Sequence, residues 1–247
     1  MLDVLAGTKR WAVVEGDCVD ALRALPSASV AHVITDPPYD ARTHANAATQ
    51  ARITRESSGV AFASLASPAD LSGDLLRVSA RWVVAFCAVE QVGEYARGAG
   101  DAWVRAGVWD KINPAPQISG DRPGQAVEAI AIMHRCGRKR WNRGGGAGIW
   151  RCMAPRGDDR PDHPTPKPVA LMEQIIRDFT DEGDVVLDPF AGSGTTGVAA
   201  LRLGRRVILI EREPRWAALC RERLSAEAGR RARVSCDMGQ PSLWGDA

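Results

Sequence analysis

The chain has 247 residues, of which 45% are hydrophobic and 25% are charged, as in an ordinary globular protein. Its formal net charge is only +2, so a polyanionic partner would have to be held by a local basic patch and not by the overall field. Because no stretch approaches the ~18 consecutive apolar residues of a membrane helix and no signal-type leader opens the chain, we expect one cytoplasmic domain over residues 1–247, without membrane contact.

The cysteines are scattered singly, without a Cys-x-x-Cys pair or the Cys and His spacing of zinc sites. We therefore expect reduced, mostly buried thiols and no bound metal. The six are Cys18, Cys87, Cys136, Cys152, Cys220 and Cys236.

The first elements follow the order strand, turn, helix, strand. Residues 11–15 alternate apolar and polar side chains, residues 19–25 have helical spacing, and residues 30–35 form a compact apolar strand. Asp17 follows the first strand and Asp36 follows the second. In open α/β sheets ligands bind outside the carboxyl ends of strands, so both acids are candidate ligand contacts.

A short turn of Asp36, Pro37, Pro38 and Tyr39 follows the second strand. Two prolines fix two φ angles and remove two backbone donors, which leaves carbonyls able to accept hydrogen bonds from a ligand. Acceptors and an aromatic ring within four residues suit a flat group that carries an NH2, such as an adenine or cytosine edge. An ordinary strand-to-loop turn is the alternative, and the rest of the chain has to decide between them.

Residues 40–67 lose hydrophobic periodicity and are rich in Ala, Thr, Ser and Asn, with arginines that include Arg42. A loop of this length in a compact domain is usually a lid, a binding segment or disorder. Because it directly follows Tyr39, we expect a mobile loop over the active site.

The middle of the chain alternates helical and strand patterns. Helices are predicted over residues 68–78 and 90–98, and strands over residues 82–87, 103–109 and 126–133. This alternation predicts a doubly wound, mostly parallel sheet.

The most basic part of the chain lies within residues 135–162, where no acid occurs before Asp158 and tryptophans are interleaved with the cations. Such a mixture fits phosphate and base contacts, although charge runs are more often solvated surface loops. We predict a short target-recognition segment here. The candidate DNA contacts are Arg42 from the preceding loop and Arg138, Lys139, Arg140, Trp141, Arg143 and Arg151.

A glycine-rich turn links two further strands. After a predicted helix over residues 169–179, the strand 185–187 ends at Asp188, a turn leads into a helix over 198–203, and the strand 207–210 ends at Glu211. The turn contains Ala191, Gly192, Ser193, Gly194, Thr195 and Thr196. A strand–turn–helix–strand unit with an acid at the tip of its second strand is typical of a site for a nucleoside-bearing cofactor.

The sequence around this turn narrows the choice of cofactor. A phosphate-binding loop would need a lysine after its last glycine, where this chain has Thr195. Asp188 and Glu211 disfavour a pyrophosphate and favour a cation. S-adenosylmethionine, which carries a sulfonium and an ammonium, fits best.

The last predicted helix spans residues 214–228, with Trp216 and Leu219 among its inward side chains. In the tail we expect one edge strand around Val234, followed by a frayed end.

With these pieces in place, three blocks of the sequence in this order resemble the DNA amino-methyltransferases of the permuted, beta-type arrangement, of the adenine-N6-specific kind. They are residues 16–39, residues 163–168 and residues 188–196. The resemblance implies a Rossmann-like fold for S-adenosylmethionine-dependent methyl transfer, with circularly permuted motifs. It also implies double-stranded DNA as the substrate, often in a restriction-modification system.

The resemblance assigns roles to individual residues. It implies that Asp36 and the Pro37 carbonyl accept hydrogen bonds from the target amine, and that Tyr39 stacks on a base flipped out of the duplex. The predicted catalytic residues are thus Asp36, Pro37, Pro38 and Tyr39. The predicted cofactor contacts are Asp17, Cys18, Asp36, Thr165, Lys167, Asp188, Phe190, Ala191, Gly192, Ser193, Gly194, Thr195, Thr196, Glu211 and Arg212.

Within the cofactor set, the resemblance places Glu211 on the ribose, and Asp17 with Cys18 on the adenine edge. Asp188 and the glycine turn would hold the methionine portion, and Thr165 and Lys167 would help to close the pocket.

Three alternatives remain at this point. The target could be cytosine N4, the chain could be a non-catalytic nucleic-acid-binding subunit, or it could methylate RNA or a protein amide. In the last group the glycine turn normally precedes the catalytic turn, opposite to the order here. The short recognition segment implies modest sequence specificity or a second subunit, and a homodimer is expected because relatives are often dimers.

Overall fold

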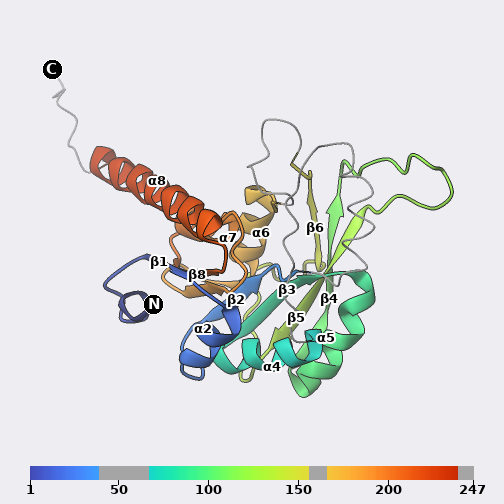
Figure 1. The fold of residues 1–247 in the computed structure, drawn as a ribbon, viewed down its shortest axis with the longest axis horizontal. Coiled ribbons are helices and arrows are strands. Elements are labelled where there is room, and N and C mark those ends of the chain that lie inside the picture. The colour runs from blue at the N-terminus through green and yellow to red at the C-terminus, as the bar shows by residue number, and fades with distance from the viewer. Residues whose placement is uncertain (39–66, 156–165, 239–247) are drawn as a thin grey trace.

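The computed structural model describes residues 1–38, 67–155 and 166–238, with the side chains of 231–238 left out. One eight-stranded sheet forms its centre, with helices on both faces (Figure 1). The strand order is β1-β8-β7-β2-β3-β5-β4-β6. The strands are β1 (Trp11–Glu15), β2 (His32–Thr35), β3 (Trp82–Cys87), β4 (Trp103–Lys111), β5 (Val127–His134), β6 (Ile149–Cys152), β7 (Val185–Asp188) and β8 (Arg206–Glu211).

Most neighbouring strands run parallel, which confirms the predicted doubly wound sheet. The exceptions are the pairs that β5 makes with β3 and with β4, both of which are antiparallel. As a result, β5 begins at the edge of the sheet where its neighbours end. Residues near the start of β5 therefore lie beside the carboxyl ends of the parallel strands.

Alternating side chains of the strands face two separate helical layers. Val84 and Phe86 of β3 belong to the core cluster that includes α6 and α7, whereas Val83 and Ala85 belong to the cluster with α2, α4 and α5. Figure 1 shows α4 and α5 on one side of the sheet and α6, α7 and α8 on the other. The helices are α1 (Leu2–Leu5), α2 (Cys18–Ala24), α4 (Pro68–Val78), α5 (Val92–Ala99), α6 (Val169–Phe179), α7 (Thr195–Arg202) and α8 (Pro214–Met238), with short 3₁₀ turns at Val89–Gln91 and Gly100–Ala102.

Two segments differ from the prediction. Strand β6 lies inside the basic segment, where no strand was predicted, and it pairs parallel to the end of β4. The tail does not form an edge strand, because α8 continues through Val234 to Met238. Residues 226–233 are mostly Ala, Arg and Glu, which are strong helix formers, so they extend the helix that precedes them.

The described thiols are free. Cys18, Cys87 and Cys220 are buried, while Cys152 is half-buried and Cys136 is exposed. Among the described helices, none has both the length and the apolar character that a bilayer span requires.

Candidate active site

Acidic side chains from both halves of the sequence meet at one edge of the sheet. Glu211 ends β8 and Asp188 ends β7, while Asp17 lies two residues after β1 and Asp36 directly follows β2. Because β1, β8, β7 and β2 are consecutive neighbours and mutually parallel, their carboxyl ends lie side by side. The fold thus brings the Asp36 turn and the glycine turn to the same edge, as the sequence predicts.

Asp188 is the most deeply buried of these acids, with 2% of its surface exposed. The Thr35 hydroxyl donates to its Oδ1 at 2.7 Å, and the Phe190 backbone N–H donates to the same oxygen at 3.0 Å. Burial raises the pKa of Asp188 to about 6, although hydrogen bonds from Thr196, Thr35 and Phe190 oppose that rise, and the nearby charge of Asp36 adds to it. A buried carboxylate of this kind is stabilised by a bound cation.

Glu211 organises the glycine turn through its carboxylate. Its Oε2 accepts from the backbone N–H of Gly192 at 2.7 Å, and its Oε1 accepts from that of Glu213 at 2.9 Å. Burial raises its pKa above the ordinary value. Each carboxylate oxygen can accept two hydrogen bonds, so Glu211 can hold the turn and also accept from ligand hydroxyls.

The glycine turn needs its glycines. Gly192 and Gly194 have φ angles of 51° and 79°, in the left-handed region that other residues rarely adopt. The Cys220 thiol of α8 donates to the Gly192 carbonyl at 3.3 Å. A β-carbon added at Gly194 would lie 2.9 Å from that sulfur, so the turn is packed directly against α8.

We expect Gly194→Ala to destabilise the protein by about 2 to 4 kcal/mol, because it combines left-handed strain with a clash. Gly183→Ala is a matched control, since Gly183 has a φ of 85° but open space around the added carbon. That variant should lose only about 1 kcal/mol. Denaturant unfolding of both proteins measures the difference, and equal losses would show that the contact with Cys220 carries no strain.

The predicted adenine-side contacts lie at the same edge. The Asp17 carboxylate accepts from the backbone N–H of Val19 at 2.8 Å and so caps α2. Burial raises the pKa of the Cys18 thiol to about 11, which keeps it neutral. Phe190 is half-buried against the core, and Arg212 is exposed.

The structure assigns Lys167 a contact that sequence reasoning missed. Its ammonium lies 2.6 Å from Oδ2 of Asp36 and 3.1 Å from Oε2 of Glu128. Its expected role in closing the cofactor pocket stays a prediction, and the contacts described here join it to the Asp36 turn. Lys111 in turn lies 2.7 Å from Oε1 of Glu128. Glu128 is the only acidic residue of β5, a strand that is otherwise almost entirely apolar. This isolated charge is the sequence signal that could have pointed to a role for Glu128.

Some predicted residues lie outside the described part of the chain. They are Tyr39, Arg42 and Thr165, together with most of the loop over residues 40–67 and with residues 156–162 of the basic segment. Pro37 and Pro38 are described, and they follow β2 in buried and half-buried positions.

The first half of the basic segment lies at the opposite edge of the sheet from Asp36. Antiparallel β5 carries the chain to the edge where β3 begins, and there Arg135 donates its backbone N–H to the Arg81 carbonyl. The indole of Trp82, the first residue of β3, donates to the Arg140 carbonyl at 2.6 Å. The structure therefore does not bring Arg138, Lys139 and Arg140 together with the catalytic turn.

The tryptophans of this segment pack in the interior. Trp150 is fully buried, and its indole donates to Oδ2 of Asp178 at 2.8 Å. Trp141 is packed against the core, with its ring edge-on to Phe179 at a centroid distance of 4.9 Å. These rings stabilise the fold, which corrects our expectation that aromatic side chains of this segment would be available to bases.

Strand β6 returns the segment to the carboxyl edge. The Arg143 guanidinium donates to the carbonyls of Ala147 and Ile149, so it holds the turn that leads into β6. Arg151 pairs with Asp110 at 2.9 Å but keeps 74% of its side chain exposed. Of the cations predicted for DNA contact and described here, Arg151 is the one that lies at the carboxyl edge of the sheet, where Asp36 also lies.

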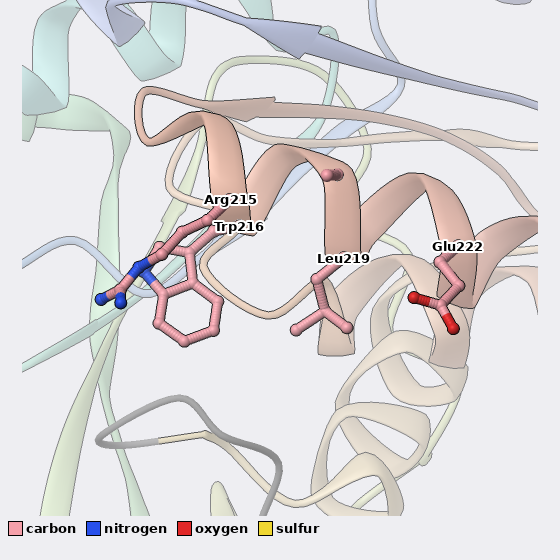
Figure 2. Close-up of a pocket in the computed structure, with 5 residues that line it drawn as sticks. Arg215, Trp216, Leu219 and Glu222 are labelled. Carbon is pink, nitrogen blue, oxygen red and sulfur yellow. The ribbon is translucent and has the colours of Figure 1, made fainter.

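A hollow beside the first turns of α8 lies apart from these residues (Figure 2). It is lined by Arg215, Trp216, Ala218, Leu219 and Glu222, and the Arg215 guanidinium lies over the Trp216 ring. Trp216 and Leu219 are half-buried here, which corrects the prediction that they face inward. None of the predicted cofactor contacts lines this hollow.

Comparison with known proteins agrees with this geometry. A family model described as DNA methylase matches residues 102–222. A type II methyltransferase of Haemophilus influenzae, M.HinfI, is 26% identical over 86% of this chain and 67% of its own length. Another from Streptococcus pneumoniae, M2.DpnII, is 38% identical over 48% of this chain and 50% of its own length. The chain thus spans about half to two thirds of the lengths of these curated relatives.

The fold agrees as well. The crystal structure of an M1.HpyAVI–SAM complex superposes with a TM-score of 0.65 at 25% identity, covering 87% of this chain and 100% of the other. The family match includes β4, β5, the glycine turn and the first turns of α8. Residues 102–222 of the chain therefore resemble the N6/N4 DNA methylases, and the described fold resembles that of the M1.HpyAVI–SAM complex.

Proposed function

We propose that this protein transfers a methyl group from S-adenosylmethionine to the exocyclic amino nitrogen of a base in double-stranded DNA, and that the base is adenine. The observation that carries this proposal is the meeting of the Asp36 turn with Asp188 and the glycine turn at one edge of the sheet. The proposed amine site at the Asp36 turn therefore lies next to the proposed site for a cationic nucleoside at Asp188 and the glycine turn.

The residues at this edge fit the proposed cofactor. Asp188 is a buried carboxylate that a cation would stabilise, and Glu211 retains acceptor capacity for ribose hydroxyls. The left-handed glycines keep the turn free of side chains where a ligand would approach. When bound, the sulfonium supplies an electrophilic methyl group. Asp17 and the neutral Cys18 thiol lie farther along the same edge, where the adenine would lie.

The catalytic turn acts on the nucleophile. An amine conjugated to its ring is a poor nucleophile because its lone pair is delocalised. Acceptors at the Asp36 carboxylate and the Pro37 carbonyl would hold the two amine hydrogens and favour a pyramidal nitrogen whose lone pair can attack. This acceptance is a preorganised electrostatic contribution, the kind of term that usually dominates enzymatic rate enhancement.

Cytosine N4 is the second candidate target, since the family model that matches residues 102–222 is named for both N6 and N4 methylases. The aspartate at the start of the catalytic turn, in this motif order, supports adenine. A homodimer stays a prediction.

Incorporation of tritiated methyl groups into unmethylated duplex DNA tests the proposal. We expect transfer to duplex DNA and not to RNA or to protein. Digestion of the product to nucleosides, followed by mass spectrometry, should yield N6-methyladenosine in its deoxy form. N4-methylcytosine would move the assignment to the second candidate, and absence of incorporation into any DNA tested would contradict the proposed activity.

A further inference from the structure

Four charged side chains form a continuous row beside the catalytic turn. Lys111 contacts Glu128 at 2.7 Å, Glu128 contacts Lys167 at 3.1 Å, and Lys167 contacts Asp36 at 2.6 Å. The charges alternate along this row, and with all four groups ionised they sum to zero. We call it the charge row.

The fold explains why these residues meet. Glu128 lies on the face of β5 that also presents Ile130 and Ile132 to α6. Trp109 is paired with Glu128 across the β4–β5 ladder, so Lys111, two residues further along β4, emerges on that same face. Lys167 lies two residues before the start of α6, and from there its ammonium contacts both Asp36 and Glu128.

The charge row is largely shielded from water. The exposed fractions of the side chains are 10% for Lys167, 14% for Glu128 and 19% for Lys111. Burial opposes ionisation of Glu128, yet the two lysines lower its pKa to about 2. Burial also opposes the charge on Lys167, but Asp36 and Glu128 outweigh it and raise its pKa. Glu128 and Lys167 therefore stay charged at neutral pH and interact strongly in this buried setting.

We propose that Glu128 is a positioning residue for the catalytic turn, acting through Lys167 on Asp36. The inference rests on the proposed function, and it adds a residue and a role. Glu128 draws part of the Lys167 charge toward β5, so the Asp36 carboxylate keeps its strength as an acceptor for the target amine. Glu128 also fixes the position of the Lys167 ammonium, and the ammonium in turn orients the Asp36 carboxylate.

The net charge of the charge row should affect the methyl-transfer step itself. The attacking nitrogen gains positive charge as its bond to the methyl group forms. With Glu128 present the charge row has no net charge, whereas with glutamine at that position the charge row carries +1 beside the reacting nitrogen. The extra positive charge disfavours the transition state more than the ground state, so kcat should fall while cofactor affinity changes little.

A double-mutant cycle tests the inference. We expect Glu128→Gln to lower kcat at saturating DNA and cofactor by at least about tenfold. Lys111→Met removes a positive charge from the far end of the charge row, so Glu128→Gln with Lys111→Met should return kcat to within about threefold of wild type. Calorimetric affinity for S-adenosylmethionine should stay within about threefold in all variants.

Glu94→Gln on α5 is a matched control, because Glu94 lies on the opposite helical layer from the charge row. Wild-type kcat in Glu128→Gln, or a double variant no faster than Glu128→Gln, would overturn the inference, since a merely structural role of Glu128 predicts no rescue by a second substitution. The proposed function is tested separately by the wild-type protein. If wild type fails to methylate DNA, the function itself is wrong, whereas an active wild type with an equally active Glu128→Gln variant contradicts only the role of Glu128.

Discussion

Asp36→Asn should lower kcat for methyl transfer by about a thousandfold, at the upper end of what one preorganised polar contact contributes. The side chain keeps its shape but loses the negative charge that holds an amine hydrogen. The ammonium of Lys167, 2.6 Å from Oδ2, would then face a neutral group and repel the developing positive charge of the nitrogen. Both effects act on the transition state, so the loss should appear in kcat more than in KM.

Single-turnover methyl transfer with excess enzyme measures this effect without interference from product release. Asp101→Asn is a matched control, because Asp101 is exposed in the turn before β4, at the edge of the sheet away from Asp36. Calorimetry should show that Asp36→Asn still binds S-adenosylmethionine, with affinity reduced by less than about tenfold, since Asp188 keeps its own partners. Transfer by Asp36→Asn at the wild-type rate would exclude Asp36 as the acceptor for the amine.

The parts of the fold that follow from local pattern were predictable. Residues 169–179 combine helical spacing with a preceding proline, and the observed α6 has these bounds. The acids at the ends of β7 and β8 flank a glycine turn in one continuous segment, so local spacing alone places them together. The position of Asp36 beside these acids was also predictable, because the carboxyl ends of neighbouring parallel strands lie at the same edge of a sheet.

The wrong predictions have two causes: the direction of a strand and the contacts made by long side chains cannot be read from local sequence pattern. Local pattern does not distinguish a parallel from an antiparallel strand, so the direction of β5 and the position of Arg138 and Lys139 at the far edge could not be foreseen. Trp141 was predicted to contact DNA because its neighbours in the sequence are basic, whereas its ring packs against the core beside Phe179. The contact between Lys167 and Asp36 spans 131 positions and depends on how α6 crosses the sheet.

Asp188→Asn should weaken binding of S-adenosylmethionine by at least about a hundredfold and at the same time stabilise the free protein. Burial raises the pKa of Asp188 from its ordinary 3.8 to about 6 in the folded protein, so the folded state holds this proton more tightly than the unfolded state. The resulting loss of stability develops as the pH rises from about 4 to about 6 and is complete above that range. At pH 8 the asparagine variant should gain up to about 3 kcal/mol.

The same proton couples binding to pH. A cationic cofactor favours ionised Asp188, so wild-type affinity should fall as the pH drops below about 6 and be constant above pH 7, and this dependence should disappear in Asp188→Asn.

Asp184→Asn is the matched control, because the Asp184 pKa is lowered, with hydrogen bonds from His32 and Asp181 overcoming the effect of burial. Removing that charge should destabilise the protein at pH 8 and leave cofactor affinity intact. Calorimetric titrations and denaturant unfolding across pH 5 to 8 measure both quantities, and an Asp188→Asn variant that binds as tightly as wild type would remove Asp188 from the cofactor site.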